Sequence, residues 1–269
     1  MRRVISFGAY TFPSSVPDRG EVLRTNFGNG VPRTERLPGV DGGFDAYGAD
    51  AMANEIGAVR FRFVLVADSA AAMSAARDAV MGMASYGRAL LTIETSAGAS
   101  RWTYAKINNI AMPTEHDAFS DKIGEVTIDW QVAYPRWFAT AVGSPSAIAA
   151  SGTATSATVT AGGNAVALPV ITIDPGTAIS AAGVRVQRLV SAVVVDEIVY
   201  GAALLATDVL VIHCKGLTVR KNGVDAYSTA FTALHPAWLR LKPGANTIRV
   251  ILGVGETASV SVAWDDTWY

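Results

Sequence analysis

Cysteine is nearly absent from this sequence, and histidine and net charge are scarce as well. One cysteine, Cys214, among 269 residues excludes an internal disulfide and a cage of thiolate metal ligands. The 22 basic and 23 acidic side chains leave a formal net charge of −1, which is not typical of a surface that binds a run of phosphates. Half of the residues are apolar, so the chain can bury a substantial core in one large domain or two smaller ones.

Long apolar runs are missing too. The stretch after Met1 is interrupted by Gly8 and ends at Pro13, which is too short for a signal peptide. The charge-free window 137–173 is long enough to cross a bilayer, but Ser, Thr, Gly, Asn and Pro make up nearly half of it. We therefore expect a soluble chain without a membrane span.

The distribution of charge predicts two domains. Residues 1–140 hold 29 of the 45 charged side chains, and residues 139–168 hold none. The composition of that charge-free window suggests a linker that passes into short, weakly amphipathic strands. We place domains at 1–140 and 141–269.

The first domain is predicted to be α+β, with one helix packed on a sheet of about five strands. Apolar and polar residues alternate in 59–65 and again in 125–134, where Tyr134 is expected on the apolar face. Strands are also expected at 4–10, 89–95 and 101–112. The helix has Asp68 or Ser69 as its N-cap, and Gly87 stands where a left-handed C-terminal cap belongs; its apolar positions are Met73, Ala76, Val80 and Met83.

Residues 13–50 form an irregular arm in this prediction. The segment carries four prolines and seven glycines and lacks a clear period. A segment of this length without regular structure is usually functional or ordered by a partner.

The second domain is predicted to be a β-sandwich, so the chain as a whole is mainly β. Short strands follow one another in 166–264 with turns between them, and Asn222-Gly223 is the strongest hairpin signal. One of these predicted strands spans 238–241.

No arrangement of residues predicts catalysis, a metal site or a cofactor. Glu115-His116-Asp117 is the one acidic–imidazole cluster, and a solvated loop is favoured over a hydrolase or metal site there. His213 and Cys214 are adjacent on a predicted strand, which gives a half-exposed imidazole and a buried thiol rather than a nucleophile–base pair. Asp265-Asp266 fits a terminal turn better than a cation site.

The remaining aromatic and basic candidates do not predict a specific ligand either. For Trp238, a core position and a glycan-binding surface position are equally favoured, whereas Trp264 is expected in the core. Arg60 and Arg62 share one strand face, where a solvated or subunit-facing role is favoured over contact with nucleic acid.

The order of features resembles the distal tail proteins of long-tailed phages. It comprises an opening strand ending at Pro13, a Gly/Pro-rich arm with Arg36-Leu-Pro-Gly-Val-Asp-Gly-Gly-Phe44, a sheet with one helix, and a closing sandwich with Leu241-Lys-Pro-Gly-Ala-Asn-Thr-Ile248 and Val260–Trp264. The resemblance implies a non-catalytic virion protein that forms a homohexameric ring at the tail tip, assembled in the host cytoplasm, through which the genome passes. It implies a sandwich similar to galectins and carbohydrate-binding modules.

The implied partners are the tail tube protein, the tail hub or tail-associated lysin, and receptor-binding proteins. We expect the arm to order against a neighbouring subunit through Phe27, Arg33, Arg36, Phe44 and Tyr47. The alternative function is a module that binds host glycans through Trp238.

Overall fold

The computed structural model describes residues 3–12, 57–95, 97–112, 123–134, 136–140, 146–227 and 238–268 in full, and the backbone of 21–26, 34–35 and 44–45. The chain divides into two compact units, Met1–Phe138 and Ala139–Trp268, with Tyr269 assigned to the first. Each unit is described by itself below.

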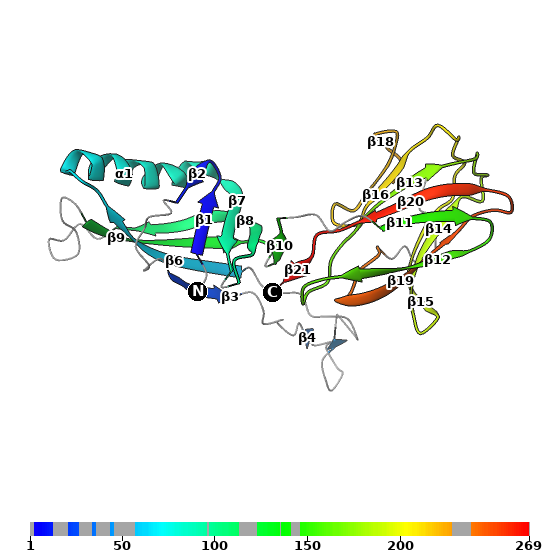
Figure 1. The fold of residues 1–269 in the computed structure, drawn as a ribbon, viewed down its shortest axis with the longest axis horizontal. Helices are drawn as coiled ribbons and strands as arrows, with labels where there is room; N and C mark the ends of the chain where they lie inside the picture. The colour runs from blue at the N-terminus through cyan, green and yellow to red at the C-terminus, as the bar shows by residue number, and fades with distance from the viewer. Residues whose placement is uncertain are drawn as a thin grey trace. The chain divides into compact units, whose positions relative to one another are not determined.

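The first unit is built on one antiparallel sheet (Figure 1). Its strands run in the order β2-β1-β7-β8-β9-β6-β3, so the sheet has β2 and β3 as its edges. Their bounds are β1 Arg3–Phe7, β2 Tyr10–Thr11, β3 Glu21–Asn26, β6 Gly57–Val66, β7 Arg88–Glu94, β8 Ser100–Ala111 and β9 Ile123–Val132. The predicted mainly β fold, with an α+β first part, is confirmed.

One helix covers one face of this sheet, as the sequence predicts. Helix α1 (Ala70–Gly82) begins after Ser69, whose Oγ accepts a hydrogen bond from the N–H of Ala72 at 3.2 Å. It continues into the 3-10 turn η1 (Met83–Tyr86), and Gly87 ends it with a φ of 62°. Met73, Val80 and Met83 are buried against the sheet.

Aromatic rings fill the space between the helix and the sheet. Phe61 and Phe63 stack at 5.2 Å, and Phe12 meets both rings edge-on at 5.5 and 5.3 Å. Trp130 lies 5.8 Å from the ring of Phe7. The prediction for Tyr134 is wrong: β9 ends at Val132, and Tyr134 lies beyond it, exposed.

Within the residues that the structure describes, the predicted irregular arm contains three strands. Strand β3 pairs antiparallel with β6, with Val22 opposite Phe61 and Thr25 opposite Val59. Strands β4 (Thr34–Glu35) and β5 (Phe44–Asp45) pair with each other. The prediction of an irregular chain is therefore wrong for residues 21–26, whose partner strand lies in the same chain.

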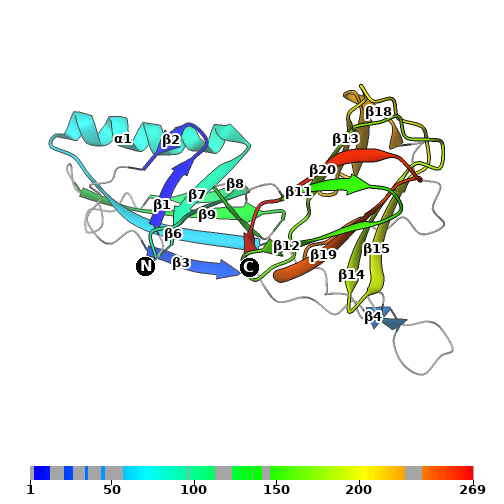
Figure 2. The same ribbon diagram turned by 45° about the vertical axis from the view of Figure 1, so that its right-hand side comes forward.

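The second unit is a sandwich of two antiparallel sheets, which Figure 2 shows face to face. One sheet runs β11-β20-β13-β16-β17-β18, and the other runs β12-β19-β14-β15. Their bounds are β11 Ser146–Ser151, β12 Thr155–Ala161, β13 Val170–Pro175, β14 Val184–Val190, β15 Val193–Tyr200, β16 Leu210–His213, β17 Thr218–Lys221, β18 Val224–Asp225, β19 Gly244–Ile251 and β20 Thr257–Ala263. The short strands β10 (Trp137–Ala139) and β21 (Thr267–Trp268) complete the chain.

Two details of this unit differ from the sequence prediction. Much of the presumed linker consists of regular strands, because β11 pairs along its whole length with β20 and β12 does so with β19. No strand forms at 238–241, where Leu241 makes only an isolated bridge to Ala167.

Aliphatic side chains dominate the sandwich core, including Ile171, Val186, Ile248 and Val260. One buried ion pair interrupts it: Arg188 Nε donates to Asp196 Oδ2 at 2.6 Å, and the two side chains are only 4% and 0% exposed. Arg240 adds a second, longer contact of 3.3 Å to Asp196. Such a pair is retained only with good geometry, because both charges have lost their water.

The Asn222-Gly223 turn is anchored to a neighbouring loop. Both residues have positive φ, and Asn222 Nδ2 donates to Asp208 Oδ1 at 2.8 Å. The Lys221 ammonium, the N–H of Leu205 and the Asn222 amide hold the pKa of Asp208 down at about 2. The predicted hairpin is confirmed.

Candidate interaction surfaces

The residues predicted to join subunits lie outside what the structure describes. This holds for Phe27, Arg33, Arg36 and Tyr47 and for the side chain of Phe44. The cluster Glu115-His116-Asp117 lies outside as well. Their roles stay predictions.

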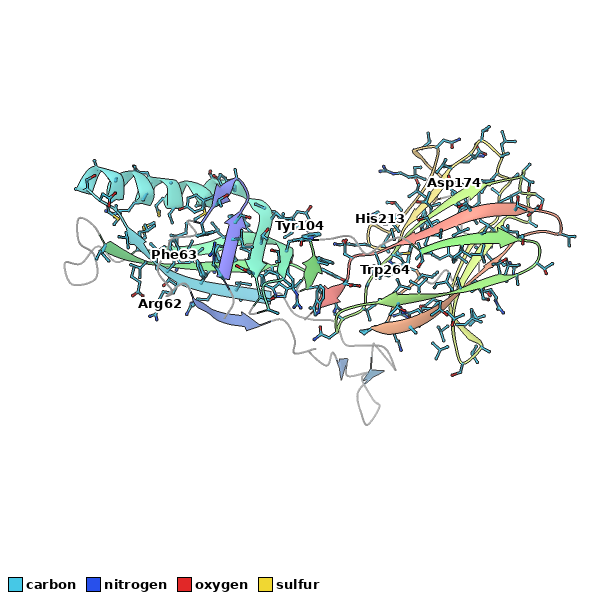
Figure 3. All side chains as sticks on the ribbon, in the orientation of Figure 1. Arg62, Phe63, Tyr104, Asp174, His213 and Trp264 are labelled. Atoms are coloured by element: carbon cyan, nitrogen blue, oxygen red, sulfur yellow. The ribbon has the colours of Figure 1, made fainter. Side chains whose placement is uncertain are left out.

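The face of the first sheet opposite α1 carries paired charges. Arg60 and Arg62 stand on this open face of β6, and Figure 3 shows Arg62 on the opposite side of the strand from Phe63. Arg60 Nε and Nη2 donate to the two carboxylate oxygens of Asp129 at 2.6 and 3.0 Å, which raises the pKa of the Arg60 guanidinium. Arg62 lies 3.6 Å from Glu125. Because Arg60 and Arg62 each have a carboxylate beside them, these two cations offer little free charge for a phosphate backbone.

A shallow groove of about 370 Å³ opens beside the Arg60–Asp129 pair. It is lined by Gly57, Ala58, Arg60, Asn108, Asp129, Trp130 and Gln131, from strands β6, β8 and β9. Amide, guanidinium and carboxylate groups can hydrogen-bond a polar side chain or a main chain laid on the sheet. Within the described part of the chain, no three His, Cys, Asp or Glu side chains gather as a metal site.

An aromatic patch lies on the same open face, which we define as Arg88, Leu90, Trp102, Tyr104, Tyr134 and Phe138. Trp102 and Tyr104 alternate along β8 with Thr103 and Ala105, which are buried on the other face. The Trp102 ring lies 4.7 Å from that of Phe138, and the Arg88 guanidinium stands 4.8 Å over Tyr104. Register places Leu90 beside Tyr104.

Sequence reasoning missed this patch, although the alternation in residues 101–105 could have indicated it. Leu90, Tyr104 and Tyr134 of this patch are exposed, whereas Phe138 is buried. Aromatic and arginine side chains that lie together at a surface are typical of protein–protein interfaces. The composition of this face is therefore typical of a contact surface.

The prediction for His213 and Cys214 is confirmed in the second unit, and Figure 3 shows where His213 lies. His213 Nδ1 accepts a hydrogen bond from the N–H of Gly216 at 2.8 Å, so the half-exposed ring serves a local turn. Cys214 is buried, and burial raises the pKa of its thiol to about 12. The thiol is thereby kept protonated and unreactive.

Trp264 and Asp266 hold the C-terminal segment together. Trp264 is in the sandwich core, as predicted, and its Nε1 donates to Asp266 Oδ1 at 3.0 Å. The same oxygen accepts the N–H of Gly162 at 2.6 Å. Burial raises the pKa of Asp265 beside it. This use of Asp266 agrees with a structural turn.

Trp238 is half-buried. Its ring packs against the sandwich core and lies 6.2 Å from the ring of Tyr227, nearly parallel at 15°. Two neighbours thus occupy much of the ring, although a role in binding glycans stays a prediction. Among the helices of the described residues, none has the length and apolar character needed to cross a membrane.

Comparison with known proteins identifies the fold. Residues 162–268 match the family model of the siphovirus-type tail component, C-terminal domain (SPP1_Dit). No curated protein sequence matches the chain.

Two solved structures are similar over almost the whole chain. The Dit protein (gp 19.1) of phage SPP1, described as a paradigm of the hub adsorption apparatus in phages that infect Gram-positive hosts, is 16% identical, with complete coverage of both chains and a TM-score of 0.65. A chain of the phage P2 baseplate in its activated, Ca-bound conformation is 9% identical over 97% of this chain and 98% of that one, with a TM-score of 0.43. The chain has the Dit fold, and its resemblance to distal tail proteins is confirmed.

Proposed function

We propose that this Dit-like chain is a structural protein of a siphovirus-type virion, placed at the distal end of the tail. The observation that carries the proposal is the match of residues 162–268 to a tail component domain, joined to a first unit that completes the Dit fold. The similar SPP1 protein is described as a hub. The function requires no chemistry, since a hub acts by holding other proteins in place.

The first unit would build a homohexameric ring that continues the tail tube and lets the genome pass. A closed cyclic ring needs two different, complementary surfaces on each subunit. The open sheet face, with the aromatic patch and the groove beside Arg60, supplies one such surface. A neighbour's arm, with Phe27, Arg33, Arg36, Phe44 and Tyr47, would supply the other.

The remaining partners follow from the same role. The ring would contact the tail tube protein on one side and the tail hub or tail-associated lysin on the other, with receptor-binding proteins around it. Assembly would take place in the host cytoplasm, and no cofactor is required. We do not extend the proposal to host glycans, because Trp238 already packs on the core and beside Tyr227.

The ring is tested by light scattering of the purified full-length chain together with negative-stain images. We expect a mass six times the 28.1 kDa of one chain and an annulus with a central hole. Tyr104→Glu should reduce this mass, because it places a carboxylate in the aromatic patch. Leu205→Glu, an exposed apolar position in the other unit, is the matched control and should leave the mass unchanged.

A monomer at high concentration would refute the ring. A hexamer that persists when residues 27–47 are replaced by a short Gly/Ser linker would refute the role of the arm. That replacement keeps β3, whose pairing with β6 belongs to the subunit itself.

A further inference from the structure

Residues 238–241, which we call the strap, contact both sheets of the sandwich without belonging to either. They form no strand, and Leu241 makes an isolated bridge to Ala167, just before β13. Leu239 and Leu241 are fully buried, whereas Arg240 between them is exposed. The strap is thus an extended segment that turns alternate side chains into the core.

The strap is attached at three separate points. The main-chain amide of Leu239 lies against the sulfur of Cys214, directly after β16. The N–H of Arg240 lies 3.4 Å from Asp196 Oδ2, on β15, and the Arg240 guanidinium lies 3.3 Å from Oδ1. The isolated bridge adds two main-chain hydrogen bonds of 2.8 and 2.9 Å. These contacts go to three different elements, whereas each bond of a ladder is flanked by others from the same pair of strands.

The contact between Arg240 and Asp196 can be released without leaving a buried charge unpaired. Asp196 is fully buried, and Arg188 Nε donates to its Oδ2 at 2.6 Å, closer than either Arg240 contact. Removal of one partner from a buried pair is normally costly because the other charge is left alone. When the strap lifts away, however, Asp196 keeps Arg188, and Arg240, whose side chain is already 44% exposed, is hydrated by water. Arg240 is therefore a catch that can open.

The chain that follows the strap is fixed to its sheet. Asn246, on β19 and only 3% exposed, accepts the N–H of Lys242 through Oδ1 at 3.0 Å. Its Nδ2 donates to the carbonyl oxygens of Lys242 and Gly244 at 2.8 and 2.9 Å. Because these bonds involve no residue of the strap, the strap can pivot at Lys242 while β19 keeps its pairing with β12 and β14.

We propose that the strap opens as a unit, pivoting at Lys242, while both sheets stay folded, and that this opening is the route by which solvent reaches Cys214. The two buried leucines keep the open state rare. The freed residues regain conformational entropy, which offsets part of that cost, so opening requires less free energy than unfolding of both sheets. It uncovers the thiol, the Asp196 carboxylate and the main-chain groups of Ala167. The strap would open in the isolated protein as well, so this inference stands apart from the proposed function.

The alternative is a strap that separates only when the whole sandwich unfolds. The two cases differ in how the labelling of Cys214 depends on urea, because the effect of urea grows with the surface that an opening exposes. A short strap exposes little surface, so at low urea the labelling rate should hardly change, and it should rise steeply only near the unfolding transition. Separation with the sheets would give the steep dependence at every urea concentration.

The experiment follows the reaction of Cys214 with Ellman's reagent in the full-length protein, from no urea to the unfolding midpoint at constant pH. Arg240→Ala removes the catch and should raise the low-urea rate about tenfold, as expected for the loss of a hydrogen bond to a charged group. Ile148→Val, in the core on β11, is the matched control. It should lower the urea midpoint but leave the low-urea rate unchanged, because it destabilises the closed and open forms equally.

Hydrogen exchange gives a second measurement that needs no variant. The amides of residues 239–241 should exchange faster, by about tenfold or more, than those of Ile171 and Ile212 on the paired strands β13 and β16. Equal exchange at these positions would overturn the inference. So would a labelling rate that depends on urea as steeply at low as at high concentration, or an Ile148→Val rate raised as much as that of Arg240→Ala. Each of these results would assign the strap to the cooperative core of the sandwich.

Discussion

The first unit builds its core mainly from aromatic rings, whereas the sandwich builds its core from branched aliphatic side chains. In the first unit Phe12, Phe61, Phe63 and Trp130 meet in one cluster beneath a single helix. In the sandwich, two sheets each contribute many small contacts, such as those of Ile171 from one sheet and Ile248 from the other. In the first arrangement the described helix covers one face of the sheet.

This difference distinguishes the sandwich, whose two sheets cover each other's inner faces, from the first unit, which presents a sheet face for contacts. A sandwich buries the inner faces of both sheets against each other, so its remaining contacts with partners are confined to edges and hairpin tips. In the first unit the sheet has a second face opposite α1, and that face carries the aromatic patch. Five predictions would sharpen or break this contrast.

The largest expected effect is on the reactivity of Cys214. This thiol lies in the sandwich core, so its labelling rate measures the opening of the sandwich alone. Burial raises the pKa of Cys214 from 9.0 to about 12, so the thiolate fraction near pH 8 should be about a thousandfold lower than in the unfolded chain. Ellman's reagent should label the native protein very slowly and the urea-unfolded protein at once. Rapid labelling of the native protein would show that the sandwich is not closed.

Removal of one ring should strongly destabilise the first unit. Phe63→Ala takes away a fully buried ring that contacts two others, and we expect a loss of about 3–5 kcal/mol in the free energy of unfolding. Ile171→Val in the sandwich should cost only about 0.5–1.5 kcal/mol. Calorimetry measures both, and labelling of Cys214 should stay slow in Phe63→Ala. Equal losses in the two variants would contradict the contrast between the cores.

Breaking the buried ion pair should destabilise the sandwich by a similar amount. Asp196→Ala leaves the Arg188 guanidinium buried without its carboxylate, at a cost of about 3–5 kcal/mol, and should speed the labelling of Cys214. The double variant Arg188→Met with Asp196→Leu should recover most of the loss, since it leaves no buried charge without a partner, and Arg240, which also contacts Asp196, is partly exposed to water. A double variant as unstable as the single one would show that packing, not charge, is responsible.

A smaller gain is expected at the hairpin tip between β14 and β15, where Ser191 and Ala192 have positive φ. Ser191→Asn with Ala192→Gly introduces residues that tolerate positive φ, and the sandwich should gain about 0.5–2 kcal/mol. Urea denaturation would measure the gain. Asn222→Ser with Gly223→Ala is the reciprocal variant and should lose stability, and a neutral result in both would mean that neither turn is strained.

The smallest effect is expected on the open sheet face. Arg60→Ala removes an exposed ion pair with Asp129, and the melting temperature should stay essentially unchanged because water already screens both charges. The same variant should weaken the ring if the groove beside Arg60 is a subunit contact. A large drop in melting temperature would assign the pair to folding instead.

Local patterns in the sequence were sufficient for the helix and for most strands. Ser69 and Gly87 mark the helix ends through their own hydrogen bond and φ, and alternation in 59–65 requires no distant information. Strand β3 was missed because it depends on pairing with β6, over thirty residues away in sequence. Strands β11 and β12 were underestimated because alanine, serine and threonine give a weak alternation, which their long partners β20 and β19 complete.

The candidate surfaces were harder to predict than the fold. Whether Trp102 and Tyr104 face the helix or solvent depends on the register of β8 against β7 and β9, which composition does not specify. The sequence pattern around the apolar hairpin tip at residues 190–195 is that of ordinary strands. Its exposure follows only from where β19 stops pairing.

The Asn222-Gly223 turn also has a consequence for how the protein ages. Glycine has no side chain to hinder attack of its main-chain nitrogen on the side-chain amide carbon of Asn222, so this dipeptide is prone to form a cyclic imide with loss of ammonia, which water then opens to aspartate or isoaspartate. The product would place a carboxylate where the Asn222 amide now donates to Asp208. Two like charges would then oppose each other across the loop, so deamidation during long storage would loosen the sandwich from this corner.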